Sequence, residues 1–570
     1  MRAPFLLLAC CLGLIACHPT RVADTPSPPG EPAGEAASPT PEPVPVYDMA
    51  MSARTASEVA QFAPPPAPPA PPGPWNGPTP GANTERYASR TDNPVQRTAD
   101  TPVSTFSIDV DTGSYSNVRR MLRQGVRPPA DAVRAEEFIN YFRYGHPAPS
   151  VREVPFRITT ELAPSPWARG RQLLMIGLRG YDVPRTSLPA ANLVFLIDTS
   201  GSMGSPDKLP LLQKAFAELV AQLRPQDRVS LVTYAGSAGL VLAPTPGDRK
   251  AEILSALRNL HAGGSTHGSA GLHLAYETAR QAHVEGGINR VILATDGDFN
   301  VGIVDRGALE TYVADQRRGG IALSTLGFGQ GNYHDAMAER LADVGDGQHA
   351  YIDTLQEARK VLVEELSSTL LTIANDVKVQ VEFDPARVAE YRLIGYENRV
   401  LREEDFANDR VDAGDIGAGH EVTALYETVP VGSADAWLSP RRYGTPSPQA
   451  ASSTAGEIAR VSLRYKLPGE TRSRLVETTV RSADLRMQPG ESLRFAAAVA
   501  AYADALRGGT RLGDWGWDDI RREVAAARGG DPWGLRGELL GLVDLARAHA
   551  DAPAATTVPG QPSGAGRPNR

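Results

Sequence analysis

The stretch Asn192-Leu-Val-Phe-Leu-Ile-Asp198-Thr-Ser200-Gly-Ser202-Met203 places an apolar strand directly before a turn that carries one carboxylate and two hydroxyls. The strand does not alternate polar with apolar side chains, a pattern typical of a parallel strand buried on both faces. Asp198, Ser200 and Ser202 occupy alternate positions, so their oxygen atoms are expected on one side of the turn. Hard cations such as Mg²⁺ prefer oxygen ligands. The turn therefore predicts a divalent-cation site.

Two further oxygen donors come from distant segments. Thr266 lies in Gly263-Gly-Ser-Thr266-His-Gly268, before a predicted helix, and Asp296 directly follows the apolar run Val291-Ile-Leu-Ala-Thr295. In open α/β sheets the carboxyl ends of the strands form a ligand-binding edge, so these residues are expected to meet there. The alternatives are a turn and helix N-cap without metal, for which Asp, Ser and Gly are the usual residues, and a metal site that has lost affinity.

The five positions resemble the metal-ion-dependent adhesion site of von Willebrand factor type A (VWA) domains. The resemblance implies that the hydroxyls of Ser200, Ser202 and Thr266 bind the cation directly, and that Asp198 and Asp296 bind it directly or through water. It implies Mg²⁺, or another divalent cation such as Mn²⁺ or Ca²⁺. It also implies one open coordination position, which takes an acidic side chain of a protein partner.

The wider sequence predicts an α/β fold with flanking domains. Residues 190–375 alternate strands with helices, which indicates a doubly wound, mostly parallel sheet with helices on both faces, as in Rossmann-like VWA domains; its last helix is expected at Leu355–Leu371. Residues 101–189 are expected to form an α+β extension. Residues 376–550 show alternating strands and then helices, which predicts an antiparallel sheet or sandwich followed by helices. Both flanking blocks resemble those of a family of bacterial VWA lipoproteins.

The amino terminus predicts export. Residues 1–16 have a charged start and a short apolar core, typical of a signal peptide. Leu14-Ile15-Ala16-Cys17 resembles the bacterial lipobox, which implies that Cys17 becomes the lipidated first residue, carrying palmitate-type acyl chains; an ordinary signal peptide is the alternative. Several acyl chains give stable membrane anchoring. His18 follows the cysteine where Asp is usual for inner-membrane retention, so an outer-membrane location in the cell envelope is favoured.

Composition limits the remaining possibilities. Residues 17–100 form a Pro-rich linker and residues 551–570 a polar tail, neither of which has a core-forming pattern. The chain has 58 basic and 66 acidic side chains without a basic stripe, so nucleic acid is not an expected partner. Its 10 histidines show no zinc spacing, and all three cysteines lie in the first 17 residues. No nucleophile elbow occurs, and we do not expect an enzyme.

The sequence thus predicts a lipid-anchored envelope protein whose VWA domain captures an acidic side chain of another protein through a bound cation. One alternative is a metal-dependent hydrolase, for which His267 is the only general-base candidate in the motif loops. The second alternative is a structural lipoprotein with an idle metal site, in which the carboxyl-terminal sheet makes the interactions.

Overall fold

The computed structural model describes residue 87 and residues 91–551, apart from 109–110, 152, 265–267, 298–305, 330–334, 366–367, 369, 412 and 443–455. The predicted lipidation residue Cys17, the linker up to residue 86 and the tail from residue 552 lie outside the described residues. The helices that the structure describes include none that is both long and apolar enough to cross a bilayer.

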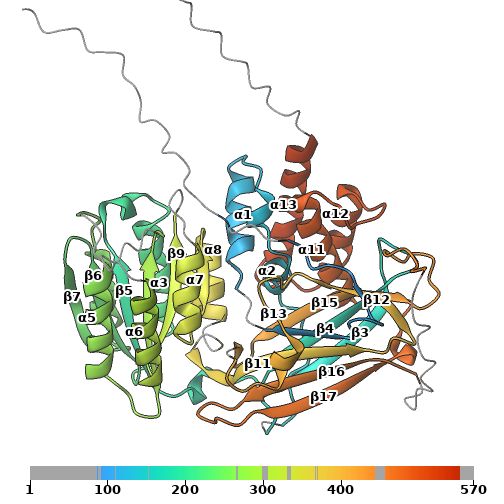
Figure 1. Cartoon of the computed structure of the whole chain (residues 1–570). Coiled ribbons are helices and arrows are strands. Elements are labelled where there is room, and N and C mark those ends of the chain that lie inside the picture. Colours follow the sequence, from blue (N-terminus) through green and yellow to red (C-terminus); the bar gives the residue numbers. More distant parts are fainter. Residues whose placement is uncertain are drawn as a thin grey trace, which may run out of the picture. The chain divides into compact units, whose positions relative to one another are not determined.

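Residues 191–364 form the α/β domain, a six-stranded sheet with the strand order β10-β9-β8-β5-β6-β7 (Figure 1). All neighbouring pairs are parallel except β6 and β7, which are antiparallel. The strands are β5 (Ala191–Asp198), β6 (Arg228–Tyr234), β7 (Ala238–Pro246), β8 (Ile288–Thr295), β9 (Ala322–Phe328) and β10 (His349–Ile352). The predicted doubly wound sheet is confirmed, although the sequence reasoning missed the edge strand β7.

Helices cover both faces of this sheet because successive side chains of a strand point to opposite faces. Leu193, Phe195 and Ile197 of β5 pack against α3, α4 and α8, whereas Val194 and Leu196 pack against the opposite layer, α5, α6 and α7. The helices are α3 (Leu209–Ala221), α4 (Lys250–Arg258), α5 (Gly268–Gln281), α6 (Arg306–Arg318), α7 (Asp335–Val344) and α8 (Leu355–Arg359). Both faces of β5 are therefore buried, as its apolar run predicts.

The expected last helix, Leu355–Leu371, is less regular than predicted, although Ser368 and Leu370 near its end are helical. The α-helix α8 ends at Arg359 and continues as a π-helical turn over Lys360–Glu364, and strand β11 begins at Thr372. The apolar run Val361-Leu-Val363 fits a helix in the sequence, but tertiary packing overrides local propensity at this boundary.

Strands from both sides of the α/β domain combine into two antiparallel sheets. The first has the order β1-β12-β15-β4-β3 and the second β13-β2-β11-β16-β17, with β14 paired to β11. The early strands are β1 (Gln96–Arg97), β2 (Val103–Ser107), β3 (Phe156–Pro164) and β4 (Gln172–Gly180). The late strands are β11 (Thr372–Phe383), β12 (Val388–Ile394), β13 (Val400–Leu401), β14 (Gly414–Gly417), β15 (Glu421–Pro430), β16 (Glu457–Lys466) and β17 (Arg474–Arg481). The α/β domain is thus inserted between β4 and β11 of one sandwich.

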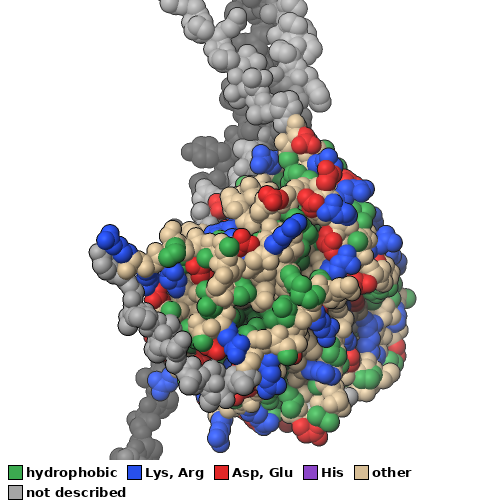
Figure 2. All heavy atoms as spheres, turned by 90° about the vertical axis from the view of Figure 1, so that its right-hand side faces the viewer, with side chains coloured by type: hydrophobic (Ala, Val, Ile, Leu, Met, Phe, Trp, Pro, Cys, Tyr) green, Lys and Arg blue, Asp and Glu red, His purple; other side chains and the backbone are tan. Residues whose placement is uncertain are grey.

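A helical layer packs on the free face of the first sheet. Its main members are α1 (Gly113–Arg123), α2 (Ala135–Asn140), α11 (Glu491–Arg507), α12 (Trp517–Ala526) and α13 (Leu535–Asp551). Shorter helical segments are α10 (Glu403–Phe406) and the 3₁₀ turns η1 (Ala130–Ala132), η2 (Arg185–Ser187), η3 (Gly201–Gly204) and η5 (Ser482–Asp484). On the face shown in Figure 2, acidic and basic side chains are interspersed. The helices predicted near residues 492–506, 517–527 and 534–548 correspond to α11, α12 and α13.

Candidate metal centre

The predicted metal turn lies at the carboxyl edge of the parallel sheet. Asp198 is the last residue of β5, and Ser200 and Ser202 follow in the turn leading into η3. Asp296 follows β8, the strand next to β5. Asp198, Ser200 and Asp296 are buried, with 0%, 2% and 0% exposure, whereas Ser202 is exposed. The turn therefore presents two carboxylates at its floor and one hydroxyl toward solvent.

Short hydrogen bonds fix the shape of the turn. The backbone N–H of Ser200 donates to Oδ1 of Asp198 at 2.8 Å, and the hydroxyl oxygens of Ser200 and Ser202 lie 3.0 Å apart. The N–H of Gly201 donates to the carbonyl of Gly264 at 3.0 Å, so the loop leading toward Thr266 is held against the turn. Thr266 itself, and His267 beside it, lie outside the described residues.

Both carboxylates keep one oxygen without a donor. Oδ2 of Asp198 and Oδ1 of Asp296 are buried, and neither meets strict hydrogen-bond geometry with a group in the part of the chain that the structure describes, although the Tyr234 phenol lies close enough to Asp198 to lower its pKa. Leaving a buried carboxylate oxygen unsatisfied is costly, and native proteins almost always provide a partner. Two such oxygens on neighbouring strands form a donor set that suits a hard divalent cation.

Electrostatics at Asp198 supports the same interpretation. Burial and, to a smaller extent, the negative charge of Asp296 raise the pKa of this carboxyl to about 6, whereas hydrogen bonds from Ser200 and Tyr234 act in the opposite direction. Behind it, burial and the charge of Asp198 hold the pKa of the Tyr234 phenol well above its ordinary value. Negative charge is thus concentrated in a poorly solvated place, where a cation would be attracted.

The structure adds Lys208, a residue that the sequence reasoning missed. Its Nζ donates to Oδ2 of Asp296 at 2.8 Å, and the whole side chain is buried, with 7% exposure. The stem runs past Gly329, where φ is +80° and an added Cβ would lie 2.3 Å from Cε of Lys208. A lysine in the first turn of a predicted helix looks like a solvated residue, so no sequence signal marks it.

No group of three or more His, Cys, Asp and Glu side chains arranged for a metal is found among the described residues. The predicted site contains only two such side chains, Asp198 and Asp296, because its other donors are hydroxyls. The chemistry of this donor set therefore differs from that of a zinc or haem site, in agreement with the histidine and cysteine spacing.

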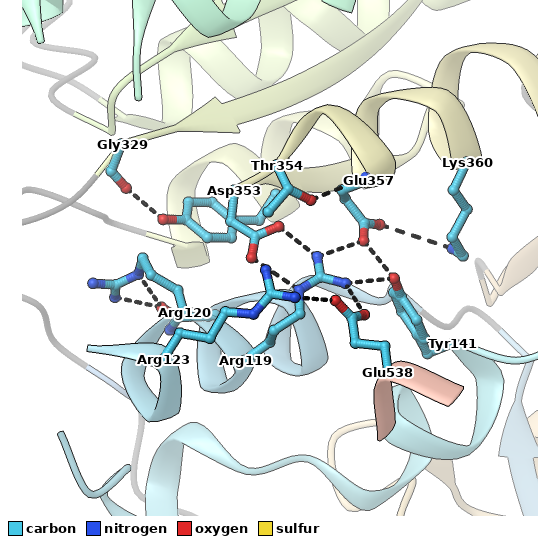
Figure 3. A network of polar contacts seen from close by, with 12 residues as sticks. Arg119, Arg120, Arg123, Tyr141, Gly329, Asp353, Thr354, Glu357, Lys360 and Glu538 are labelled. Atoms are coloured by element: carbon cyan, nitrogen blue, oxygen red, sulfur yellow. Dashed lines mark hydrogen bonds and ion pairs between the residues drawn. The ribbon is translucent and has the colours of Figure 1, made fainter. Parts of the chain in front are cut away.

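The edge of the sheet that carries the metal turn also contacts the flanking helices. Arg119 of α1 is fully buried and donates to Asp353, which follows β10, with Nε to Oδ2 at 2.9 Å (Figure 3). The same guanidinium contacts Glu357 of α8 at 2.7 Å and Glu538 of α13 at 3.0 Å. Tyr141 of α2 accepts from Arg119 at 2.7 Å and donates to Glu357 at 2.6 Å. In Figure 3 these side chains point toward the guanidinium of Arg119.

Comparisons with known proteins agree with this architecture. Residues 192–365 match the family model of the von Willebrand factor type A domain, residues 81–175 match a model described as von Willebrand factor, and residues 368–548 match the carboxyl-terminal model of the uncharacterized protein YfbK. The predicted type A domain is therefore confirmed, as is the predicted combination with a family-specific carboxyl-terminal region.

Individual relatives differ in how much of the chain they match. The uncharacterized protein YfbK of Escherichia coli is 48% identical over 478 residues, which cover 82% of this chain and 82% of YfbK. The uncharacterized protein sll0103 of Synechocystis is 30% identical over 32% of this chain and 43% of its own length. Human inter-alpha-trypsin inhibitor heavy chain H4 is 30% identical over 25% of this chain and 16% of its own. The structure of von Willebrand factor type A from Catenulispora acidiphila matches 68% of this chain and 89% of its own, with 15% identity and a TM-score of 0.37.

Proposed function

This chain belongs to the family of the Escherichia coli protein YfbK, and from that premise we propose that its type A domain captures an acidic side chain of another protein through a divalent cation. Ser200, Ser202 and Thr266 would bind the cation directly, and Asp198 and Asp296 directly or through water. The cation we propose is Mg²⁺ or a similar ion. We propose binding without bond cleavage, so the protein is not an enzyme.

The two unsatisfied carboxylate oxygens carry this proposal. Oδ2 of Asp198 and Oδ1 of Asp296 lie buried at adjacent strand ends with no hydrogen bond of standard geometry from the described residues, and a cation would satisfy both. Only two carboxylates would contribute, so a divalent cation would retain attraction for a further negative oxygen. A partner carboxylate that completes its coordination would form a charge-assisted contact.

The surroundings of the edge support an acidic partner. Ser202 is exposed, so the cation would be reachable from solvent on that side. A cavity of about 160 Å³ beside the edge is lined by Arg120 and Arg123 of α1, by Asp207 and Asp353, and by Gly329. Its two arginines are the groups that would attract an acidic segment, an effect that salt would weaken.

We also propose that Cys17 is acylated and anchors the protein to the cell envelope, with the outer membrane favoured. The lipobox-like sequence before Cys17 and the Pro-rich spacer after it support this proposal. Radiolabelled palmitate fed to cells expressing the full chain should enter the protein, whereas the Cys17→Ser variant should remain unlabelled. Equal labelling of both would exclude Cys17 as the acylation site.

The binding proposal is tested with the purified full-length chain in detergent, immobilised and exposed to envelope extract with Mg²⁺ or with chelator. Mg²⁺-dependent capture should be lost in Asp198→Ala and in Ser200→Ala. Ser205→Ala is the matched control. The Ser205 hydroxyl donates to Asp207 just beyond the motif, so its loss should not affect capture. Capture that persists in chelator would contradict a metal-mediated contact.

The His267→Ala variant distinguishes the hydrolase alternative from our proposal. If the cation served hydrolysis, this variant would lose turnover of a phosphoester or peptide substrate. Our proposal expects unchanged capture by His267→Ala and no turnover by the wild type. The idle-site alternative predicts no thermal response to Mg²⁺ in either the wild type or Ser200→Ala, whereas we expect stabilisation of the wild type alone.

A further inference from the structure

A second cavity, of about 270 Å³, lies at the opposite edge of the α/β sheet from the candidate metal centre. It is bordered by the amino-terminal parts of β8, β9 and β10 and by segments of the sandwich, including residues 413–417 and His420. Arg290 of β8 lines it, six positions before Asp296 in the same extended segment, which corresponds to about 20 Å. The cavity is therefore separate from the metal turn.

Arg290 is a buried cation on which Asp346 and Asp415 act at longer range, and no ion-pair partner for it is found among the described residues. Its exposed fraction is 4%, and Nη1 donates to the hydroxyl of Ser324 at 2.6 Å. Nε has no hydrogen-bond partner, and no carboxylate lies within ion-pair distance of the guanidinium among the described residues. Burial lowers the pKa of Arg290 to about 10, so the side chain remains charged at neutral pH. An unpaired buried charge is expensive and calls for an explanation.

The nearest acidic groups do not neutralise it. Asp346 pairs with Arg317 at 2.9 Å. Asp415 accepts from the Asn375 amide at 2.7 Å and from the backbone N–H of Asp376 at 3.2 Å. Burial and the charge of Asp346 hold the pKa of Asp415 well above its ordinary value, which favours the neutral acid.

The other charged side chains around the cavity have partners of their own. Arg399 contacts Asp111 at 3.7 Å and Asp343 at 3.5 Å, and Arg340 pairs outside the cavity with Glu310 at 3.2 Å. Arg143, Glu365 and Glu421 also line the cavity and pair with Glu364 at 3.6 Å, Lys360 at 3.1 Å and Arg179 at 3.0 Å. Among the described lining residues, Arg290 is therefore the arginine without an ion pair.

The rest of the lining suits a small organic body. Apolar side chains form part of the wall, namely Phe142, Ile292, Leu326, Val361 and Leu362. Nδ1 of His420 is buried without a hydrogen-bond partner among the described residues, and burial lowers the pKa of this ring, which favours its neutral form. Beside its paired charges, the cavity thus offers one arginine without an ion pair, one histidine nitrogen without a hydrogen-bond partner among the described residues, and an apolar wall, a combination typical of ligand sites.

We propose that this cavity binds a small organic anion, with its carboxylate or phosphate on the guanidinium of Arg290 and a short apolar body against Ile292 and Leu326. A planar anion would accept from Nε and a terminal nitrogen of the guanidinium together, the bidentate geometry that arginine favours. This site does not require the metal centre, so it stands or falls independently of the proposed function.

Two measurements on the full-length chain test the proposal: isothermal titration calorimetry for binding and thermal unfolding for stability. Both use butanoate, inorganic phosphate and chloride at matched ionic strength. Butanoate tests a carboxylate with an apolar body, and phosphate tests the anion alone. We expect saturable binding of butanoate or phosphate, but not of chloride, and a rise in Tm with that anion. Arg290→Met should weaken binding at least tenfold. The affinity of Arg290→Lys should lie between those of the wild type and Arg290→Met.

Two further outcomes separate a ligand site from a structural role. Without anion, Arg290→Met should unfold at the same temperature as the wild type or higher, because it removes an unpaired buried charge. Arg340→Met, which alters a cavity-lining arginine that is paired elsewhere, should bind like the wild type. If both anions stabilise the wild type and Arg290→Met equally, the effect is a general salt effect. If no saturable binding is found and Arg290→Met has a lower Tm than the wild type, Arg290 has a structural role. Either result overturns the proposal.

Discussion

Nζ of Lys208 lies 2.8 Å from Oδ2 of Asp296, so the protein places a cation of its own on one of the two carboxylates of the candidate metal centre. This contact satisfies one oxygen of Asp296, whereas Oδ1 has no donor among the residues that the structure describes. Lys208 therefore both orients Asp296 and repels an incoming cation.

Replacing Lys208 separates these two effects. Lys208→Met leaves buried carboxylates without their ammonium partner, and we expect the apoprotein to lose about 3–5 kcal/mol of stability. Mg²⁺ should then stabilise the variant more than it stabilises the wild type, because the competing charge is gone. Thermal unfolding with Mg²⁺ and with chelator measures both effects. Lys214→Met, an exposed position of the same helix, is the control; a variant that folds but ignores Mg²⁺ would show that Lys208 is needed to hold Asp296.

Gly329 should matter through the same lysine. Gly329 has φ of +80°, and an added Cβ would lie 2.3 Å from Cε of Lys208. Gly329→Ala should destabilise the protein by about 1–3 kcal/mol through backbone strain and displacement of Lys208. In a double-mutant cycle by urea unfolding, Gly329→Ala should cost less in the Lys208→Ala background, since the steric part disappears. Additive effects would mean that the lysine stem moves aside at no cost.

The metal response should depend on pH through Asp198. Its pKa is raised from 3.8 to about 6, so this group stabilises the apoprotein below pH 3.8 and loses that contribution as pH rises through 6, a change of about 3 kcal/mol. A bound cation requires the ionised form, so Mg²⁺-induced stabilisation should be full above pH 7 and should weaken below pH 6. Unfolding at a series of pH values with and without Mg²⁺ tests this prediction. A Mg²⁺ effect that stays constant from pH 5 to pH 8 would contradict it.

Arg119 should anchor the flanking helices to the α/β domain. Arg119→Met leaves the carboxylates of Asp353, Glu357 and Glu538 without their shared cation, and we expect a loss of about 3–5 kcal/mol. Arg123, which is exposed and pairs with Glu538, is the matched control, and Arg123→Met should cost less than about 1 kcal/mol. Urea unfolding of the two variants distinguishes these values, and similar losses would refute a special role for the buried arginine.

The local sequence patterns determined much of the α/β domain. The apolar run of β5 shows burial on both faces because nearly every position is apolar, and the Asp198-Thr-Ser200-Gly-Ser202 turn follows it directly. Both are properties of neighbouring residues, which is why the strand, the turn and the type A family could be predicted without coordinates. The sequence analysis did not predict the π-helical turn after α8 or the strand β7. Long-range packing determines the structure of these two segments, and their local sequence pattern does not.

Only the tertiary structure decided which distant segments meet. Strand β4 pairs with β15 and β2 pairs with β11, so the residues before and after the α/β domain share two sheets. Alternation in a strand indicates which face is buried but not which strand will be its neighbour, since backbone hydrogen bonds are alike for every sequence. The same holds for Lys208, Arg119 and Arg290. A charged residue looks solvated in a sequence. Whether it is buried, and whether a partner from a distant part of the sequence lies beside it, is decided by the fold.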